Sequence, residues 1–191
     1  MGSRVESKTG AREFCRVAIE MCRAETGLAE TLGRDIPRTW REGLKRRAGV
    51  QNVGEFGTTG GFIFIRKEVG EVILGKRGDV TIVCERDGGK VEEVLAGRQK
   101  DFLNETEALG EREGEELETV TLRFQKFLAF LLATDGIGDE LDREKLGELF
   151  EYLKENYRGG RGHNLLRRDI KETFGEKNND DQTMIFGWGM R

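Results

Sequence analysis

Three aspartates lie at short spacing in the C-terminal half of the chain, at Asp135, Asp139 and Asp142. Mg²⁺ and Ca²⁺ prefer carboxylate oxygens as ligands, so this segment is a candidate metal site. It does not match an EF-hand loop. Counting from Asp135, Glu140 stands at position 6 and Leu146 at position 12, where that motif needs Gly and a bidentate Glu. Capping of helix N-termini by these acids is the alternative.

The sequence offers few residues for nucleophilic catalysis. Its one histidine, His163, lies in a glycine-rich stretch, and its two serines, Ser3 and Ser7, lie near the N-terminus. A Ser–His hydrolase would have to take its nucleophile from that N-terminal segment. Cys15 and Cys22 are about 10.5 Å apart along a helix axis, too far for a disulfide or for two ligands of one zinc ion.

We therefore assign no catalytic residue and no metal ligand, expect no cofactor, and consider an enzyme less probable than a binding protein. A metal-dependent enzyme that uses Asp135, Asp139 and His163 is kept as an alternative function.

Two basic segments are the strongest functional lead. Segment 34–47 has six basic and two acidic residues, net +4, and segment 158–171 has five basic and one acidic residue, also net +4. In the first segment, four of the basic residues share one side of a helix. Arginine beside glycine, as in the second, suits contacts with phosphates and bases. The candidate nucleic-acid contacts are Arg34, Arg38, Arg41, Lys45, Arg46, Arg47, Arg158, Arg161, Arg167 and Arg168.

Acidic segments oppose these basic ones. Segment 101–118 has eight acids and one base, net −7, and segment 135–151 has seven acids and two bases, net −5. The whole chain carries −4, whereas a dedicated nucleic-acid binder is usually basic. The charged faces could instead be solvated, pair with one another, or join subunits of a homo-oligomer.

The order of predicted elements is helices, then strands, then helices. Apolar periodicity predicts helices over 10–32 and from Asp35 to Ala48, and later over 98–109, 115–134, 142–157 and 164–174. Between them, short β-rich runs at 62–67, 71–75, 80–86 and 90–96 predict an antiparallel meander, with a hairpin turn at Asp87-Gly88-Gly89.

These elements predict an α+β protein whose small antiparallel β-meander, about 62–96, packs against N-terminal and C-terminal amphipathic helices. We expect one compact domain over 1–191, helical over 10–48 and 98–175, with a tail over 176–191. No apolar run reaches the ~18 residues of a membrane span, and no signal peptide is visible, so we expect an intracellular, cytoplasmic protein.

The leading functional hypothesis is a non-enzymatic binding or assembly protein that contacts RNA or DNA phosphates. The scarcity of Pro, His, Gln and Ser favours a purine-rich coding strand and hence a virus-encoded protein. The alternatives are a protein–protein or self-assembling structural protein, which could use the apolar segment from Met184 to Met190, and the metal-dependent enzyme.

Overall fold

The structure is a computed structural model, and it describes residues 4–24, 28–48, 50, 52–96, 107–157, 162–174 and 183–190. The chain divides into two compact units. The first comprises Met1–Arg66, Glu71–Asp79 and Gly97–Leu122, and the second comprises Lys67–Gly70, Val80–Ala96 and Arg123–Arg191.

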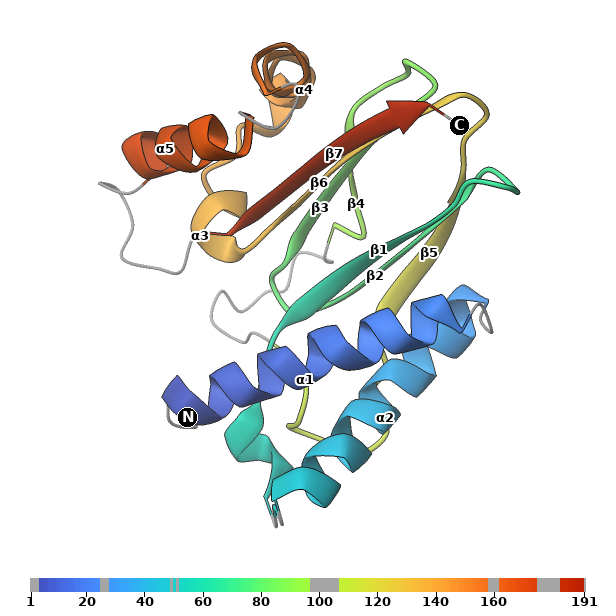
Figure 1. Cartoon of the computed structure of the whole chain (residues 1–191), viewed down its shortest axis with the longest axis vertical. Helices are drawn as coiled ribbons and strands as arrows, with labels where there is room; N and C mark the ends of the chain where they lie inside the picture. Colours follow the sequence, from blue (N-terminus) through green and yellow to red (C-terminus); the bar gives the residue numbers. More distant parts are fainter. Residues whose placement is uncertain are drawn as a thin grey trace. The chain divides into compact units, whose positions relative to one another are not determined.

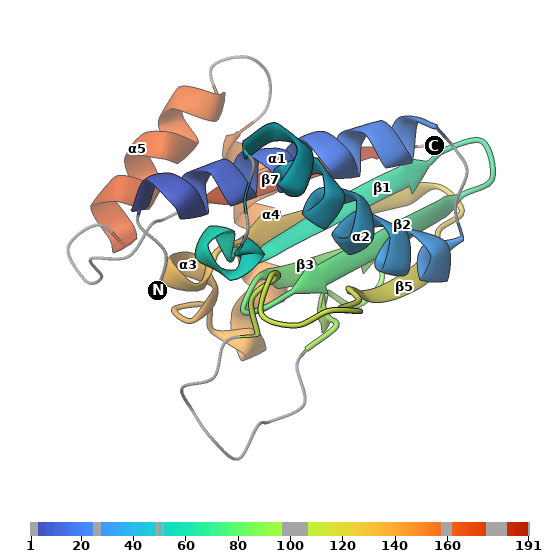
Figure 2. The same ribbon diagram turned by 90° about the horizontal axis from the view of Figure 1, so that it is seen from below.

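The first unit is a three-stranded sheet covered by two helices (Figures 1 and 2). Its sheet has the order β1-β2-β5, and β1 pairs antiparallel with β2. Helix α1 packs on β1 and helix α2 on β2. The elements are α1 (Arg4–Arg23), α2 (Ala29–Ala48), the 3-10 turn η1 (Val53–Phe56), β1 (Gly60–Arg66), β2 (Glu71–Arg77) and β5 (Glu118–Arg123).

The core of this unit is formed by one side of each helix and one face of the sheet. Phe14 and Val17 of α1 meet Ile36 and Trp40 of α2, and all four side chains are buried. The indole Nε1 of Trp40 donates a hydrogen bond of 2.8 Å to the carbonyl of Gly10, which satisfies the polar atom of this fully buried ring.

A proline inside α2 explains how strand β5 is attached to the helix. Pro37 has no N–H, so the carbonyl of Gly33 four residues earlier has no partner within the helix. That carbonyl accepts a hydrogen bond of 2.9 Å from the amide of Leu117, just before β5. A Cβ at Gly33 would lie 3.0 Å from the Leu117 carbonyl and from Thr119. Pro37 leaves the Gly33 carbonyl available, and the small size of Gly33 lets the segment at the start of β5 pack closely against α2.

The second unit is a four-stranded antiparallel sheet of order β4-β3-β6-β7 with helices that follow β6 (Figure 1). Its strands are β3 (Thr81–Arg86), β4 (Glu92–Val94), β6 (Phe127–Ala133) and β7 (Met184–Met190). Its helices are α3 (Asp135–Gly138), the 3-10 turn η2 (Arg143–Lys145), α4 (Leu146–Asn156) and α5 (Gly162–Phe174).

Two turns at one end of this sheet are joined by Asp87. The residue adopts a positive φ of 56°, and its carboxylate accepts hydrogen bonds from the backbone amides of Gln125, Lys126 and Phe127. These three bonds lower the pKa of the Asp87 carboxyl, because they favour its charged form. Asp87 thereby fixes the chain where it enters β6.

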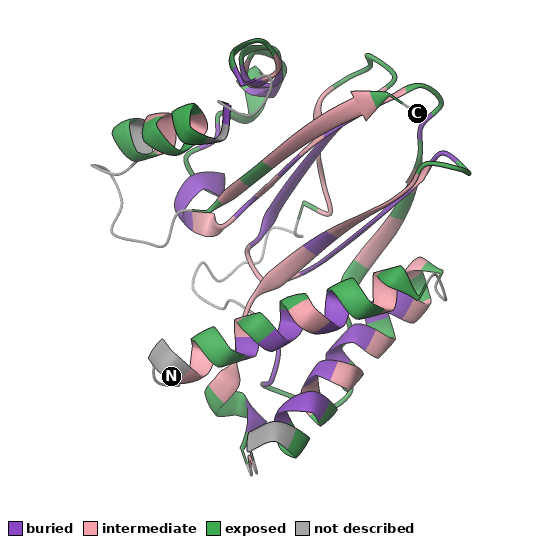
Figure 3. Cartoon of the chain, in the orientation of Figure 1, coloured by how far each residue is buried: buried purple, intermediate pink, exposed green. Residues whose placement is uncertain are grey.

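Strand β6 lies between β3 and β7, and the core of the second unit is built around it. Leu131 and Ala133 of β6 pack with Ile137, Phe150 and Leu153, and all five are buried. In Figure 3, buried residues run along β3 and β6 and continue into α3.

The predicted fold class is confirmed: the chain is an α+β protein with antiparallel sheets between helices at both ends. The strands over 62–96 form parts of two sheets, since β1 and β2 belong to one and β3 and β4 to the other. The hairpin at Asp87-Gly88-Gly89 is confirmed. That the chain is one domain stays a prediction.

One predicted helix is wrong. Residues 115–134 contain strands β5 and β6, with a bend at Gln125 and Lys126 between them. The seven-residue apolar run Phe127–Ala133 shows no strict alternation: β6 has a strand on each side, and buried residues occur at both odd and even positions along it, such as Leu128 and Ala129. The first helix ends at Arg23, and the second begins at Ala29 rather than at Asp35.

Helices 142–157 and 164–174 correspond to α4 and α5, whereas most of the predicted helix 98–109 lies outside the described residues. The apolar segment 184–190, a candidate surface for self-assembly, is strand β7 and pairs along its length with β6. No helix within the described ranges has the length and hydropathy needed to cross a bilayer.

Candidate active site

Asp135 lies just after the end of β6, one of the two inner strands of the second unit. Strand β6 carries the chain through the core to Ala133, Thr134 remains extended, and Asp135 begins the short helix α3. The Asp135 carboxylate accepts a hydrogen bond of 2.8 Å from the amide of Gly136, and the amide of Asp139 bonds to the Asp135 carbonyl at 3.0 Å. The Asp135 side chain is half-buried, and Asp139 is exposed. We call residues 134–142 the Asp135 turn.

The start of β7 holds the Asp135 turn from one side. The amide of Thr134 donates to the carbonyl of Thr183 at 3.0 Å, and the amide of Thr183 donates to the Thr134 hydroxyl at 3.0 Å. In the sequence, Thr183 closely follows Asp180 and Asp181, which lie outside the described residues. These two hydrogen bonds join the end of β6, which is followed by Asp135, to Thr183. Two further aspartates precede Thr183 in the sequence.

Strand β3 and Arg143 hold the turn from the other side. A Cβ at Gly138 would lie 2.3 Å from the Thr81 hydroxyl, so this close approach to β3 requires glycine. The Arg143 guanidinium donates to the carbonyls of Gly138 and Leu141 at 2.5 and 2.8 Å, and it pairs with Glu93 of β4 at 3.0 Å. Arg143 is thus a positioning residue for the Asp135 turn.

The Asp135 turn carries carboxylate oxygens, which are the ligands that Mg²⁺, Mn²⁺ and Ca²⁺ prefer. Carboxylates at residues i and i+4 of a helical turn point to the same side, so Asp135 and Asp139 are the two candidate cation ligands here. Within the described residues, however, no three His, Cys, Asp or Glu side chains come together as a metal site. These residues do not complete a metal centre, and we assign no chemical step to one.

Asp142 and His163 are the other two residues that the sequence suggested for a metal site or a metal-dependent enzyme. The Asp142 carboxylate accepts a hydrogen bond of 3.0 Å from the amide of Glu144 and caps η2, which confirms the capping alternative for this aspartate. His163 lies near the start of α5, and its side chain is outside the described part of the structure.

The predicted nucleic-acid contacts of the first segment lie on α2. Arg34 and Arg38 both pair with Asp35, each at 3.2 Å, while their side chains remain 61% and 65% exposed. Arg41 is only 18% exposed and pairs with the buried Glu115 at 3.1 Å. The rest of this group is Lys45 and Arg46, which are exposed, and Arg47, whose side chain is not described.

The second predicted group is only partly described. Arg167 and Arg168 are exposed on α5, and Arg168 pairs with Asp169 at 3.3 Å. Arg158 and Arg161 lie outside the described residues. The two groups belong to different units of the chain.

The family model described as protein phosphatase 2C matches residues 1–173. Among curated proteins, no sequence matches this chain.

Three solved structures show the same fold at low sequence identity. The catalytic domain of the serine/threonine protein phosphatase PstP, in complex with two manganese ions, aligns with a TM-score of 0.68 and 15% identity, covering 100% of this chain and 84% of that one. RsbX in complex with magnesium aligns at 0.61 and 13%, covering 100% and 77%. PppA, a regulatory component of T6SS in Pseudomonas aeruginosa, aligns at 0.56 and 17%, covering 93% and 79%.

These findings contradict the leading hypothesis from the sequence. A non-enzymatic, virus-encoded protein that binds RNA or DNA was the wrong prediction, because the family model that matches most of the chain is that of a phosphatase. The expectation that the chain is not an enzyme was wrong for the same reason. The metal-dependent enzyme, kept as an alternative, agrees better with these findings.

A second signal in the sequence also points to Asp135. Phe127–Ala133 is an uninterrupted apolar run that stops at Thr134-Asp135-Gly136. An acidic residue directly after a buried strand is placed at the edge of a sheet, where side chains from neighbouring strands converge. Thr183 and Arg143 could not have been found in this way, because they contact the turn only through the fold.

Proposed function

Since the chain belongs to the protein phosphatase 2C family, we propose that it hydrolyses phosphate esters of serine and threonine side chains in a reaction that depends on a divalent cation. The single observation that carries this proposal is the family match over residues 1–173. The similarity to PstP, a serine/threonine protein phosphatase with two manganese ions, supports the substrate class and the need for a metal.

We propose Asp135 as a metal ligand of this phosphatase. Its place at the end of β6, with the turn held by Thr183 and Arg143, gives the carboxylate a fixed position. A fixed carboxylate loses little freedom when it binds a cation. Asp139, Asp180 and Asp181 are the candidates for further ligands, because Asp139 follows one helical turn later and the other two lie just before Thr183 in the sequence.

The test is phosphate release from a phosphothreonine peptide with Mn²⁺, for the wild-type protein and for Asp135→Asn. We expect the substitution to lower the rate at least about 100-fold, since losing a direct ligand costs more than losing a residue that only orients one. Glu140→Gln is the matched control, because Glu140 is an exposed acid in the same turn. Equal rates for wild type and Asp135→Asn would overturn the role of Asp135, and no Mn²⁺-dependent release would overturn the function.

An intracellular, cytoplasmic location and a homo-oligomeric state remain proposals. The location is supported by the three cysteines, all of which are free thiols. Fractionation of cells that express the protein tests the location, since recovery of the protein in the medium would contradict it. Light scattering at low and high salt tests the oligomer, which is refuted by a monomer under both conditions.

A further inference from the structure

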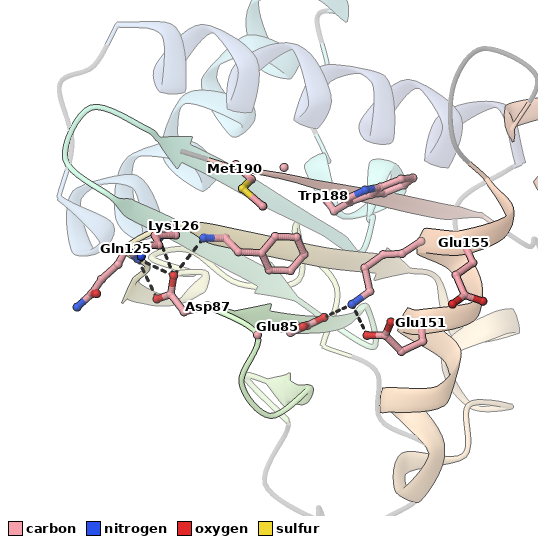
Figure 4. Close-up of a pocket in the computed structure, with 12 residues that line it drawn as sticks. Glu85, Asp87, Gln125, Lys126, Glu151, Glu155, Trp188 and Met190 are labelled. Carbon is pink, nitrogen blue, oxygen red and sulfur yellow. Dashed lines mark hydrogen bonds and ion pairs between the residues drawn. The ribbon is translucent and has the colours of Figure 1, made fainter.

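A second candidate site lies at the opposite end of β6 from Asp135. Here the second unit has a pocket of about 910 Å³ (Figure 4). It is formed by the end of β3, the turn before β6, the end of β7 and helix α4. Phe127 begins β6 and Ala133 ends it, so the pocket and the Asp135 turn are about 20 Å apart at ~3.3 Å per residue. The pocket is lined by Glu85, Asp87, Gly88, Gln125, Lys126, Phe127, Glu151, Lys154, Glu155, Trp188, Gly189 and Met190.

One part of this pocket already holds a cation of the chain itself. The Lys154 ammonium lies 2.9 Å from Glu85 and 2.5 Å from Glu151, and 5.5 Å from the centre of the Phe127 ring. Burial lowers the pKa of Lys154, but the hydrogen bonds and charges of Glu151 and Glu85 together outweigh it, so that the pKa is raised and the ammonium stays charged. A cation between carboxylates and an aromatic face is therefore a stable arrangement in this pocket.

The part of the pocket formed by Trp188 and Glu155 also combines an aromatic ring with a carboxylate, but no cation of the chain lies between them among the described residues. Trp188 comes from β7, and its ring packs against Phe186 with the centroids 5.2 Å apart, which fixes its orientation. Glu155 lies one residue beyond Lys154 on α4, is exposed, and has no ion pair within the described residues. Figure 4 shows both side chains on the α4 side of the pocket, with Met190 farther along β7.

The charge of the lining selects the sign of a ligand. Four carboxylates face two ammonium groups, which gives a net charge of −2. Lys154 is paired with Glu85 and Glu151, and Asp87 is bonded to three backbone amides. The remaining charged groups are Lys126, which lies beside Asp87 and Gln125 away from α4, and Glu155 on the α4 side (Figure 4). A ligand on the α4 side would therefore meet Glu155 and the apolar surface of Trp188, with Met190 farther along β7. An arginine fits this combination, since its planar guanidinium stacks on an aromatic ring while it pairs with a carboxylate.

We propose that this pocket binds an arginine side chain of a partner protein, stacked on Trp188 and paired with Glu155. The proposal does not depend on the phosphatase activity, because the pocket is formed by different residues at the other end of the strand. It assigns α4 and the end of β7 to the recognition of basic peptide segments.

The probe is the peptide acetyl-Gly-Arg-Gly-amide, and the readout is tryptophan fluorescence. Trp188 lines the pocket, and the second tryptophan, Trp40, is fully buried in the first unit and gives a constant background. We expect a saturable change with the arginine peptide and none with the same peptide that contains citrulline, which has the same shape without the charge. Binding should weaken at high salt.

Variants locate the site. Glu155→Gln should weaken binding about threefold to fivefold, in the range for a solvent-exposed charge pair. Glu148→Gln is the matched control, since Glu148 is exposed on the same helix but does not line the pocket. Trp188→Phe should abolish the fluorescence change, and thermal unfolding of each variant checks that it is folded.

Three results would overturn the proposal: no saturable change with the arginine peptide, equal binding of the citrulline peptide, or unchanged affinity of a folded Glu155→Gln variant. If Glu155→Gln does not fold, Glu155→Ala replaces it with the same expected direction. Phosphate release does not enter this test, so failure here and failure of the proposed activity can be told apart.

Discussion

Glu115 joins a loop to helix α2, and its replacement by glutamine tests the interactions of Arg41. The Glu115 carboxylate is 3% exposed and accepts hydrogen bonds from the amides of Gly110 and Arg112, each at 2.7 Å, and from the Arg41 guanidinium at 3.1 Å. Arg41 also donates to the carbonyl of Arg112. A residue predicted to bind nucleic acid is thus part of a buried cluster inside the first unit.

The cost of Glu115→Gln follows from this geometry. Glutamine keeps one acceptor oxygen, so one backbone amide retains its bond and the other faces an NH₂ group that cannot accept. Losing a hydrogen bond to a charged group costs about 1.5–3 kcal/mol, and losing the partly exposed pair with Arg41 adds about 0.5–1 kcal/mol. We expect the free energy of unfolding to fall by about 2–4 kcal/mol.

Urea unfolding measures this change through the midpoint at unchanged slope. Glu116→Gln is the control, because Glu116 is the exposed neighbour, and its free energy of unfolding should stay within about 0.5 kcal/mol of wild type. A loss below 0.5 kcal/mol for Glu115→Gln, as in the control, would refute the reasoning about the Glu115 cluster.

Three further predictions concern other parts of the chain. Because three backbone hydrogen bonds lower the folded-state pKa of Asp87, its contribution to stability is complete above the unfolded value and is lost as pH falls through the folded one. Asp87→Asn should therefore destabilise the protein at pH 7, and the difference from wild type in urea unfolding should shrink as the pH falls below 3.8. Gly33→Ala should lower the free energy of unfolding by about 1–3 kcal/mol, because its Cβ would crowd the start of β5. Gly147→Ala in α4, where no atom lies near the new Cβ, should raise the free energy of unfolding by about 0.5–1 kcal/mol. Equal shifts of the thermal unfolding midpoint in the two variants would contradict this. Burial raises the pKa of the Cys84 thiol to about 12, so iodoacetamide at pH 8 should label exposed Cys15 in the folded protein and Cys84 only after unfolding, as read by mass spectrometry.

Helix α4 and the hairpin at Asp87-Gly88-Gly89 were predictable, because apolar spacing and turn residues indicate the same structure that the fold adopts. Leu146, Phe150 and Leu153 repeat at helical spacing and are buried in α4. At Asp87-Gly88-Gly89, turn chemistry and the observed positive φ values coincide. Both signals involve residues close in sequence, so they do not require knowledge of the tertiary structure.

Strands β5 and β6 were not predictable from periodicity. An unbroken apolar run fits a buried strand and a buried helix equally well, and only the pairing of β6 with β3 and β7 decides between them. The start of the second helix, predicted at Asp35, was wrong for a related reason, since α2 begins at Ala29 and continues through Gly33 and Pro37. The Gly33 carbonyl, which Pro37 leaves without a helical partner, is satisfied by Leu117, a residue far along the chain.

The candidate site was partly predictable. Asp135 and Asp139 were recognised as possible cation ligands from residue type and spacing, but the basic residues were given more weight. Charge counts along the sequence do not reveal that Arg41 pairs with a buried carboxylate or that Arg34 and Arg38 share Asp35. The bonds of Thr134 with Thr183 likewise depend on the pairing of β6 with β7.

We propose that this chain is a metal-dependent phosphatase with Asp135 at its active site. The most direct measurement is phosphate release from a phosphothreonine peptide as a function of Mn²⁺, compared between wild type, Asp135→Asn and Glu140→Gln. We expect Mn²⁺-dependent release by wild type and Glu140→Gln and a loss of at least about 100-fold in Asp135→Asn. Release that does not require a divalent cation, or that is unaffected by Asp135→Asn, would contradict it.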